Sequence, residues 1–154
     1  MAIQTFKLVS PFQELGKKDY EVSDPDFVDP DAATVILPGE YVALDASHQL
    51  VRGSGGFADF AVFVEMGRSD IQVIAGNGQL TVLQRGTYEA ETLLFNTSSA
   101  PALGAKLEVA TVTYSGKSVS GLQTHAGGAK AIVGIVLQTA ANNNDYLRFL
   151  QTLV

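Results

Sequence analysis

The sequence predicts an all-β fold, with a small β-barrel or β-sandwich body that follows an extended N-terminal arm. In the body, short apolar or alternating runs are separated by turn residues about every 8–12 residues, the spacing typical of such folds. No window of a dozen residues carries a helical apolar stripe. The 154 residues are 46% hydrophobic, which is enough for one core without disulfide support.

Two segments differ in composition and in their pattern of apolar residues, so we divide the chain into an arm, residues 1–31, and a body, residues 32–154. The arm is polar, and it becomes acidic toward its end. Pro25 and Pro30 each disfavour a helical backbone at the residue before them. A segment this polar buries little against itself, so it must lie on its own body or on a neighbouring molecule. Its candidate contact residues are aromatic: Phe6, Phe12, Tyr20 and Phe27.

Apolar runs bounded by turn residues predict the strands of the body. Gly76-Asn77-Gly78 and Ser115-Gly116 are typical hairpin turns, because Asn and Gly tolerate a positive φ. Gly86 is expected to begin a new strand. Residues 92–95 and 146–150 can be interpreted either as strand or as short helices. The expected strands cover residues 34–37, 41–44, 50–51, 57–66, 71–74, 80–83, 87–95, 107–114, 131–137 and 146–154.

Charge and composition exclude several classes of function. The net charge is −6 and the 10 basic residues are scattered, which argues against nucleic acid as a partner. The chain has no cysteine, hence no disulfide and no thiolate metal site. We expect synthesis in a host cytoplasm and no membrane insertion, because no signal peptide or bilayer-length apolar stretch is visible. Charged residues are only 17% of the chain, a low value that hints at assembly.

The histidines and the phosphate-loop pattern do not indicate a catalytic site. We interpret His48, in a predicted hairpin turn, and His125, in a Gly-rich connection, as solvated loop residues. Gly116-Lys117-Ser118 resembles the end of a phosphate-binding loop, but Thr111 stands where that loop needs a glycine. A hairpin turn explains the motif better.

The acidic residues fall into two groups. Asp24, Asp26, Asp29 and Asp31 alternate as calcium ligands do, but the glycine and closing glutamate of an EF-hand are missing. We interpret them as a solvated or intersubunit acidic stretch. Glu89 and Glu91 share one strand face, without a tryptophan anywhere in the chain to form a sugar platform. We therefore predict no catalytic, metal-binding or cofactor-binding residue, and no enzymatic activity.

The overall pattern resembles that of bacteriophage head decoration (capsid cement) proteins. The resemblance lies in the arm ending near Pro30, in strand entries led by Gly39, Gly86 and Gly104, and in the C-terminal half. It implies a β-tulip-like body that sits on the outer capsid surface, often as a homotrimer. It also implies a major capsid protein as partner, a location in the virion, and an arm that clamps adjacent capsid subunits through Phe6, Phe12 and Phe27.

Two other kinds of function stay open. A tail-tube or baseplate subunit would also be rich in β-strands and extended loops. A carbohydrate-binding or small-molecule-binding β-domain is the further alternative, although the missing tryptophan weighs against it.

Overall fold

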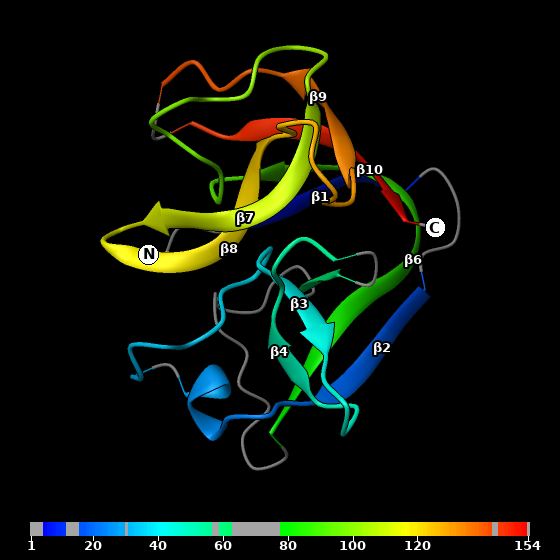
Figure 1. Ribbon diagram of the computed structural model, residues 1–154, viewed down its shortest axis with the longest axis vertical. Helices are drawn as coiled ribbons and strands as arrows, with labels where there is room; N and C mark the ends of the chain where they lie inside the picture. The colour runs from blue at the N-terminus through cyan, green and yellow to red at the C-terminus, as the bar shows by residue number, and fades with distance from the viewer. Residues whose placement is uncertain are drawn as a thin grey trace.

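The computed structural model describes residues 5–11, 16–29, 31–56, 59–62, 78–142 and 145–153. The predicted all-β class is confirmed, because ten strands and a single 3₁₀ helix account for the regular structure of these residues. The strands form two antiparallel sheets, seen as the upper and lower parts of the molecule in Figure 1.

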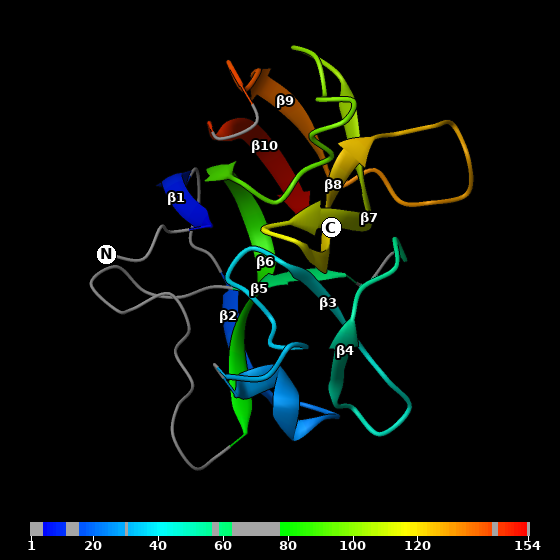
Figure 2. The ribbon, with the colours of Figure 1, turned by 90° about the vertical axis from the view of Figure 1, so that its left-hand side faces the viewer.

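One long strand, β6 (Gln79–Thr92), belongs to both sheets. Strands β1 (Phe6–Pro11) and β2 (Gly16–Glu21) both pair with β6 in antiparallel register. Phe6 lies opposite Thr92 and Glu21 lies opposite Gln79, so the two strands together follow β6 over its whole length (Figure 2).

The opposite edge of β6 is shared in the same way. Strand β10 (Leu147–Leu153) pairs with the part of β6 that also pairs with β1, and β5 (Phe60–Val62) pairs with the part beside β2. The lower sheet continues from β5 to β3 (Tyr41–Leu44) and β4 (Leu50–Arg52). Val22, just after β2, bridges Leu50 of β4, so the lower sheet curls back on itself.

The upper sheet continues from β10 to β9 (Gly134–Gln138), β7 (Lys106–Tyr114) and β8 (Lys117–Thr124). It also curls. The backbone of Leu122 in β8 donates to the carbonyl of Leu94 at 2.9 Å. Residues 94–96 follow β6 directly, so the far edge of this sheet returns to the strand at which it began.

The described part of the predicted arm lies on the chain's own body. Strands β1 and β2 are members of the two sheets, and the 3₁₀ helix η1 (Pro25–Val28) buries Val28. Asp24 begins this helix with an extended backbone, φ −130° and ψ 122°, and accepts the backbone N–H of Asp26. The sequence left open whether the arm lies on its own body or on a neighbouring molecule. The described residues of the arm lie on their own body.

Several expected elements differ from the structure. Residues 34–37 form no strand, although Val35 and Ile36 are buried. Gly86 does not begin a strand. It lies inside β6 with φ +117°, at the point where pairing passes from β2 to β10, and a glycine accepts this conformation without strain. Residues 146–150 form strand and not helix. The expected strand at 71–74 and Gly76-Asn77 lie outside the described residues.

Buried side chains form three clusters, one large and two smaller. The large one, between the sheets, includes Tyr41, Tyr88 and Phe149. A second fills the curl of the lower sheet around Val42 and Leu50. The third lies beside the β7–β8 hairpin around Leu94, Val112 and Val119.

A buried polar group sits in the large cluster where the sheets meet. Gln151 of β10 lies directly opposite Tyr88 of β6, and the Tyr41 hydroxyl donates to Gln151 Oε1. Gln151 Nε2 has no hydrogen-bond partner among the described residues, and the Tyr88 hydroxyl interacts with that of Tyr41 without the geometry of a regular hydrogen bond. Burial raises the pKa of both phenols far above the usual value, so neither titrates in the physiological range.

We predict that Gly121→Ala destabilises the protein by about 2–3 kcal/mol, as overpacking of a core does. A Cβ at Gly121 would lie 2.5 Å from the carbonyl oxygen of Leu94 and 2.5 Å from Cγ2 of Val112, and so would push β8 away from residues 94–96. Gly128→Ala is the control, because nothing lies within 4 Å of its Cβ position. Urea unfolding measures both, and equal midpoints for the two variants would contradict the closure of the upper sheet.

The two buried tyrosines give a matched pair of variants. We expect Tyr41→Phe to cost about 1–3 kcal/mol, because it leaves the amide of Gln151 without its donor. We expect Tyr88→Phe to be neutral or slightly stabilising, since it removes a buried hydroxyl that makes no regular hydrogen bond. Thermal unfolding distinguishes them, and a larger loss for Tyr88→Phe would show that its hydroxyl has a partner in solution.

Candidate functional site

Phe6, the first predicted contact residue, is buried in the chain's own core. Its exposed fraction is 8%, and its ring packs edge-on against Tyr88 with centroids 6.2 Å apart. A Cβ at Gly39 would lie 2.6 Å from the Phe6 Cβ, so the backbone at Gly39 closes over this side chain. Phe6 therefore holds β1 on the body, and it is not free to contact a partner as the sequence led us to expect.

Tyr20 and Phe27 are half-buried and pack beside the second core cluster. The Tyr20 ring stacks on Phe60 at 6.4 Å, and its hydroxyl accepts a hydrogen bond from Gln84. The Phe27 ring lies 5.5 Å from the guanidinium carbon of Arg52. Phe12 lies outside the described residues. The structure thus places Phe6 in a different cluster from Tyr20 and Phe27.

A buried polar contact between the two sheets centres on Glu40, which the sequence analysis missed. Its fully buried carboxylate accepts Nε of Arg52 at 2.9 Å. It also accepts the backbone N–H of Ser120 at 2.9 Å and that of Leu37 at 2.6 Å. Ser120 belongs to β8 of the upper sheet, and its hydroxyl donates to the carbonyl of Gly53 at 2.8 Å. One carboxylate therefore joins β4, β8 and the turn before β3.

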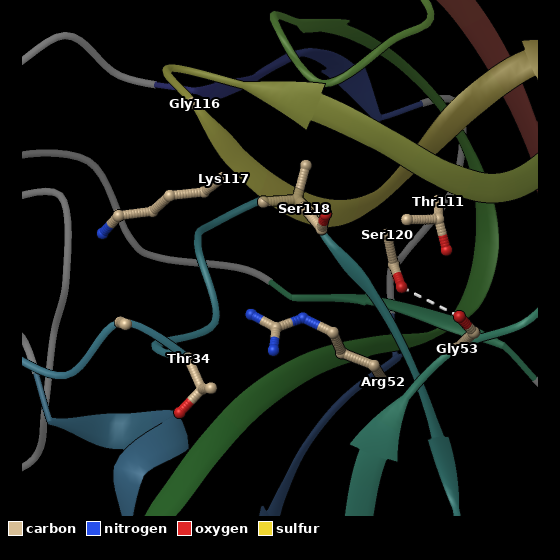
Figure 3. Close-up of a pocket in the computed structure, with 10 residues that line it drawn as sticks. Thr34, Arg52, Gly53, Thr111, Gly116, Lys117, Ser118 and Ser120 are labelled. Atoms are coloured by element: carbon tan, nitrogen blue, oxygen red, sulfur yellow. Dashed lines mark hydrogen bonds between the residues drawn. The ribbon is translucent and has the colours of Figure 1, made fainter.

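A hollow of about 500 Å³ opens beside this contact. Figure 3 shows the Arg52 side chain extending into it beneath the β7–β8 hairpin, with Thr34 on the opposite wall. None of the described residues that line it is acidic. The lining residues are Ala33, Thr34, Arg52, Gly53, Thr111, Gly116, Lys117, Ser118, Val119 and Ser120.

The predicted turns explain two of the motifs. Ser115 and Gly116 have φ values of 50° and 77°, and Tyr114 pairs with Lys117, so Gly116-Lys117-Ser118 lies at a tight hairpin as predicted. His48 is exposed, with φ 61°, in the turn between β3 and β4. Asp45 holds this turn by accepting the backbone N–H groups of Ser47 and Gln49.

His125 is not the solvated residue that we expected. Its Nδ1 lies 2.8 Å from Oε2 of Glu108, and only 15% of its side chain is exposed. Glu108 also accepts Nε2 of Gln123 at 2.7 Å and the backbone N–H of Ala126 at 3.3 Å. Burial acts to raise the Glu108 pKa, but these hydrogen bonds and the charge of Lys130 outweigh it, so the pKa lies below its usual range.

Asp59 behaves in the opposite way. It is buried beside the glycine-rich segment 53–56 and accepts the backbone N–H of Gly55 at 2.8 Å. Burial raises its pKa, although the N–H groups of that segment act against the shift. A Cβ at Gly53 would lie 2.8 Å from Asp59 Oδ2. The glycines are therefore needed for close packing around a carboxylate.

The remaining acidic residues form local contacts. Glu89 and Glu91 share one face of β6, as predicted, and both pair with Arg148, at 3.4 Å and 2.7 Å. Asp29 accepts the backbone N–H of Asp31, much as Asp24 does for Asp26. Within the described residues, no three His, Cys, Asp or Glu side chains come together in a way that could hold a metal ion.

Large apolar side chains are exposed around β9. Ile135 and Leu137 point outward from this strand, both 39% exposed, and Ile132 precedes it at 44%. Leu103 is 71% exposed, and its turn is attached to β9 because the Gly104 N–H donates to the carbonyl of Val136 at 2.9 Å. Since β9 lies between β7 and β10, this apolar surface, which we call the β9 surface, is the face of a sheet and not its edge.

Comparison with protein-family models, with curated proteins and with solved structures found no match to this chain. No helix in the described part of the chain is long and apolar enough to cross a membrane.

We predict that Arg52→Met destabilises the protein by about 3 kcal/mol, because it leaves Glu40 buried and unpaired. Arg52 is 26% exposed, which places the cost at the lower end for a buried pair. A double-mutant cycle with Glu40→Gln isolates the interaction, and we expect a coupling free energy of about 1–3 kcal/mol. If the two substitutions lowered the free energy of unfolding additively in urea, a direct interaction between these two residues would be contradicted.

A second prediction concerns Glu108 and pH. Its folded-state pKa is lowered, so its carboxylate adds stability that is present above the unfolded-state pKa of about 4.3. This contribution is lost as pH falls through the folded-state value. Glu108→Gln should therefore cost about 1–3 kcal/mol at neutral pH, as loss of hydrogen bonds to a charged group does, and progressively less below pH of about 4.

Urea midpoints measured from neutral pH downward test the Glu108 prediction. Exposed Glu21→Gln is the control and should change the midpoint little at any pH. A cost for Glu108→Gln that does not change with pH would contradict the assignment.

Proposed function

We propose that this chain is a structural virion protein that binds the outer surface of a bacteriophage capsid as a trimer. There it would clamp adjacent major capsid proteins and stabilise the expanded head. The observation that carries the proposal furthest is the β9 surface, formed by Leu103, Ile132, Ile135 and Leu137. Gathered apolar side chains on a folded surface are typical of sites that bind another protein.

The polar chemistry of the described residues supports a binding role over a catalytic one. Glu40, Glu108 and Asp59 each accept hydrogen bonds that join strands or loops of this chain. The carboxylates of Glu89 and Glu91 both face Arg148. These groups have structural partners, whereas the apolar side chains of the β9 surface stay between 39% and 71% exposed.

The contact region proposed here differs from the one expected from the sequence. Phe6 is enclosed by the core, and Tyr20 is stacked on Phe60. Partner contacts are therefore assigned to the β9 surface. Phe6, Tyr20 and Phe27 instead pack β1, β2 and η1 onto the body.

The test is co-sedimentation of the purified protein with expanded heads and with unexpanded procapsids, after light scattering has established its oligomeric state. We expect a trimer that sediments with expanded heads alone. Leu103→Glu and Ile135→Glu together should weaken binding by about 30-fold or more, as loss of a contact worth 2 kcal/mol does. Thermal unfolding should show that this double variant is folded.

Val9→Glu is the matched control. Val9 is 40% exposed, like Ile135, but lies on β1, which β6 and β10 separate from β9. We expect it to bind normally. Unchanged binding by the Leu103/Ile135 variant would contradict the assigned contact region. Spontaneous growth of the purified protein into tubes would contradict capsid decoration in favour of a tail-tube subunit.

A further inference from the structure

We propose that the hollow beneath the β7–β8 hairpin is a binding site for an oxyanion group, a carboxylate or a phosphate. This inference is independent of the proposed capsid role, because it rests on different residues. The hollow is bordered by the one motif that first suggested phosphate binding, Gly116-Lys117-Ser118. That motif forms a hairpin turn, so any anion would be held by side chains and not by a phosphate-binding loop.

Arg52 is held in one orientation at the hollow. Its Nε and Nη2 are held by Glu40, its Nη2 also donates to the carbonyl of Val35 at 2.8 Å, and its guanidinium lies on the Phe27 ring. Nη1 makes no hydrogen bond to any described residue. The guanidinium is therefore fixed in place with one nitrogen still able to donate, which lowers the entropic cost of binding an anion.

Further hydrogen-bond donors line the hollow around Arg52. Lys117 forms no ion pair with a described residue, and it lines the same hollow. The hydroxyls of Thr34, Thr111 and Ser118 also lack a hydrogen-bond partner within the described residues. Figure 3 shows Arg52 and Lys117 extending toward the same side of the hollow. Charge-assisted hydrogen bonds from such donors are the usual means of holding a carboxylate or a phosphate.

The charge of the hollow differs from that of the chain. The chain carries 16 acidic and 10 basic residues, yet none of the described residues that line the hollow is acidic. The negative charge of Glu40 neutralises the positive charge of Arg52, and the Glu40 carboxylate also accepts two backbone N–H groups. Lys117 has no such counter-charge within the part of the chain that the structure describes. The hollow is thus a locally cationic site on an acidic protein, and a bound anion would complete its charge balance.

Titration of the isotopically labelled full chain with acetate and with inorganic phosphate tests this proposal by NMR. A parallel titration with chloride at matched ionic strength gives the non-specific response. We expect saturable amide shifts, in the millimolar range, confined to Thr34, Arg52, Thr111 and 116–120. The ion that saturates at the lower concentration identifies the group, with acetate standing for the carboxylate of a protein side chain.

Two lysine variants make the test specific. Lys117→Ala should weaken saturable binding about threefold, as expected for one exposed charge pair, and Lys117→Glu should abolish it. Lys106→Ala, which removes an exposed lysine that does not line the hollow, should bind as the parent chain does. Shifts that match those of chloride, or that persist unchanged in Lys117→Glu, would overturn the proposal.

Discussion

The structure depends on the position of β6 as a strand shared by both sheets. Each half of β6 is paired on both edges, by β1 and β10 in the upper sheet and by β2 and β5 in the lower one. Both of its faces are buried: Leu83, Tyr88 and Ala90 lie in the large cluster, and Val82 lies in the second one. The first and last described strands, β1 and β10, meet on this same strand. The upper sheet therefore closes only when β1 and β10 are both in place.

Polar side chains supply the second connection between the sheets, and they do so without obvious catalytic geometry. Glu40 and Arg52 join the lower sheet to Ser120 of the upper one. Within the upper sheet, Glu108 of β7 binds the end of β8 and the segment that follows β8. Asp59 and Glu108 are both buried, but their pKa values move in opposite directions. Backbone donors and Lys130 act to lower the pKa of both groups, so the difference follows from the side-chain hydrogen bonds of Gln123 and His125, which only Glu108 receives.

Local features were predictable from the sequence, and long-range ones were not. The turn at Asp45–Gln49 and the hairpin at Ser115-Gly116 follow from residue types that accept a positive φ or hold a turn. The burial of Phe6 depends on Gly39 and Tyr88, which are far away in sequence. Glu40 and Arg52 offered a partial signal, since the β3–β4 turn pairs Val42 with Arg52 and so places Glu40 on the same face. No sequence signal pointed to Ser120, because its contact with Glu40 forms only when the two sheets are together.

Native-state hydrogen exchange along β6 tests the central claim, that one strand holds both sheets together as a cooperative unit. The amides of β6 on either side of Gly86 should exchange at similar, slow rates that follow global unfolding, because neither sheet keeps its pairing without this strand. If the amides of 79–85 instead exchanged through a local opening far less costly than that of 87–92, the sheets would be separable units and the account would be wrong.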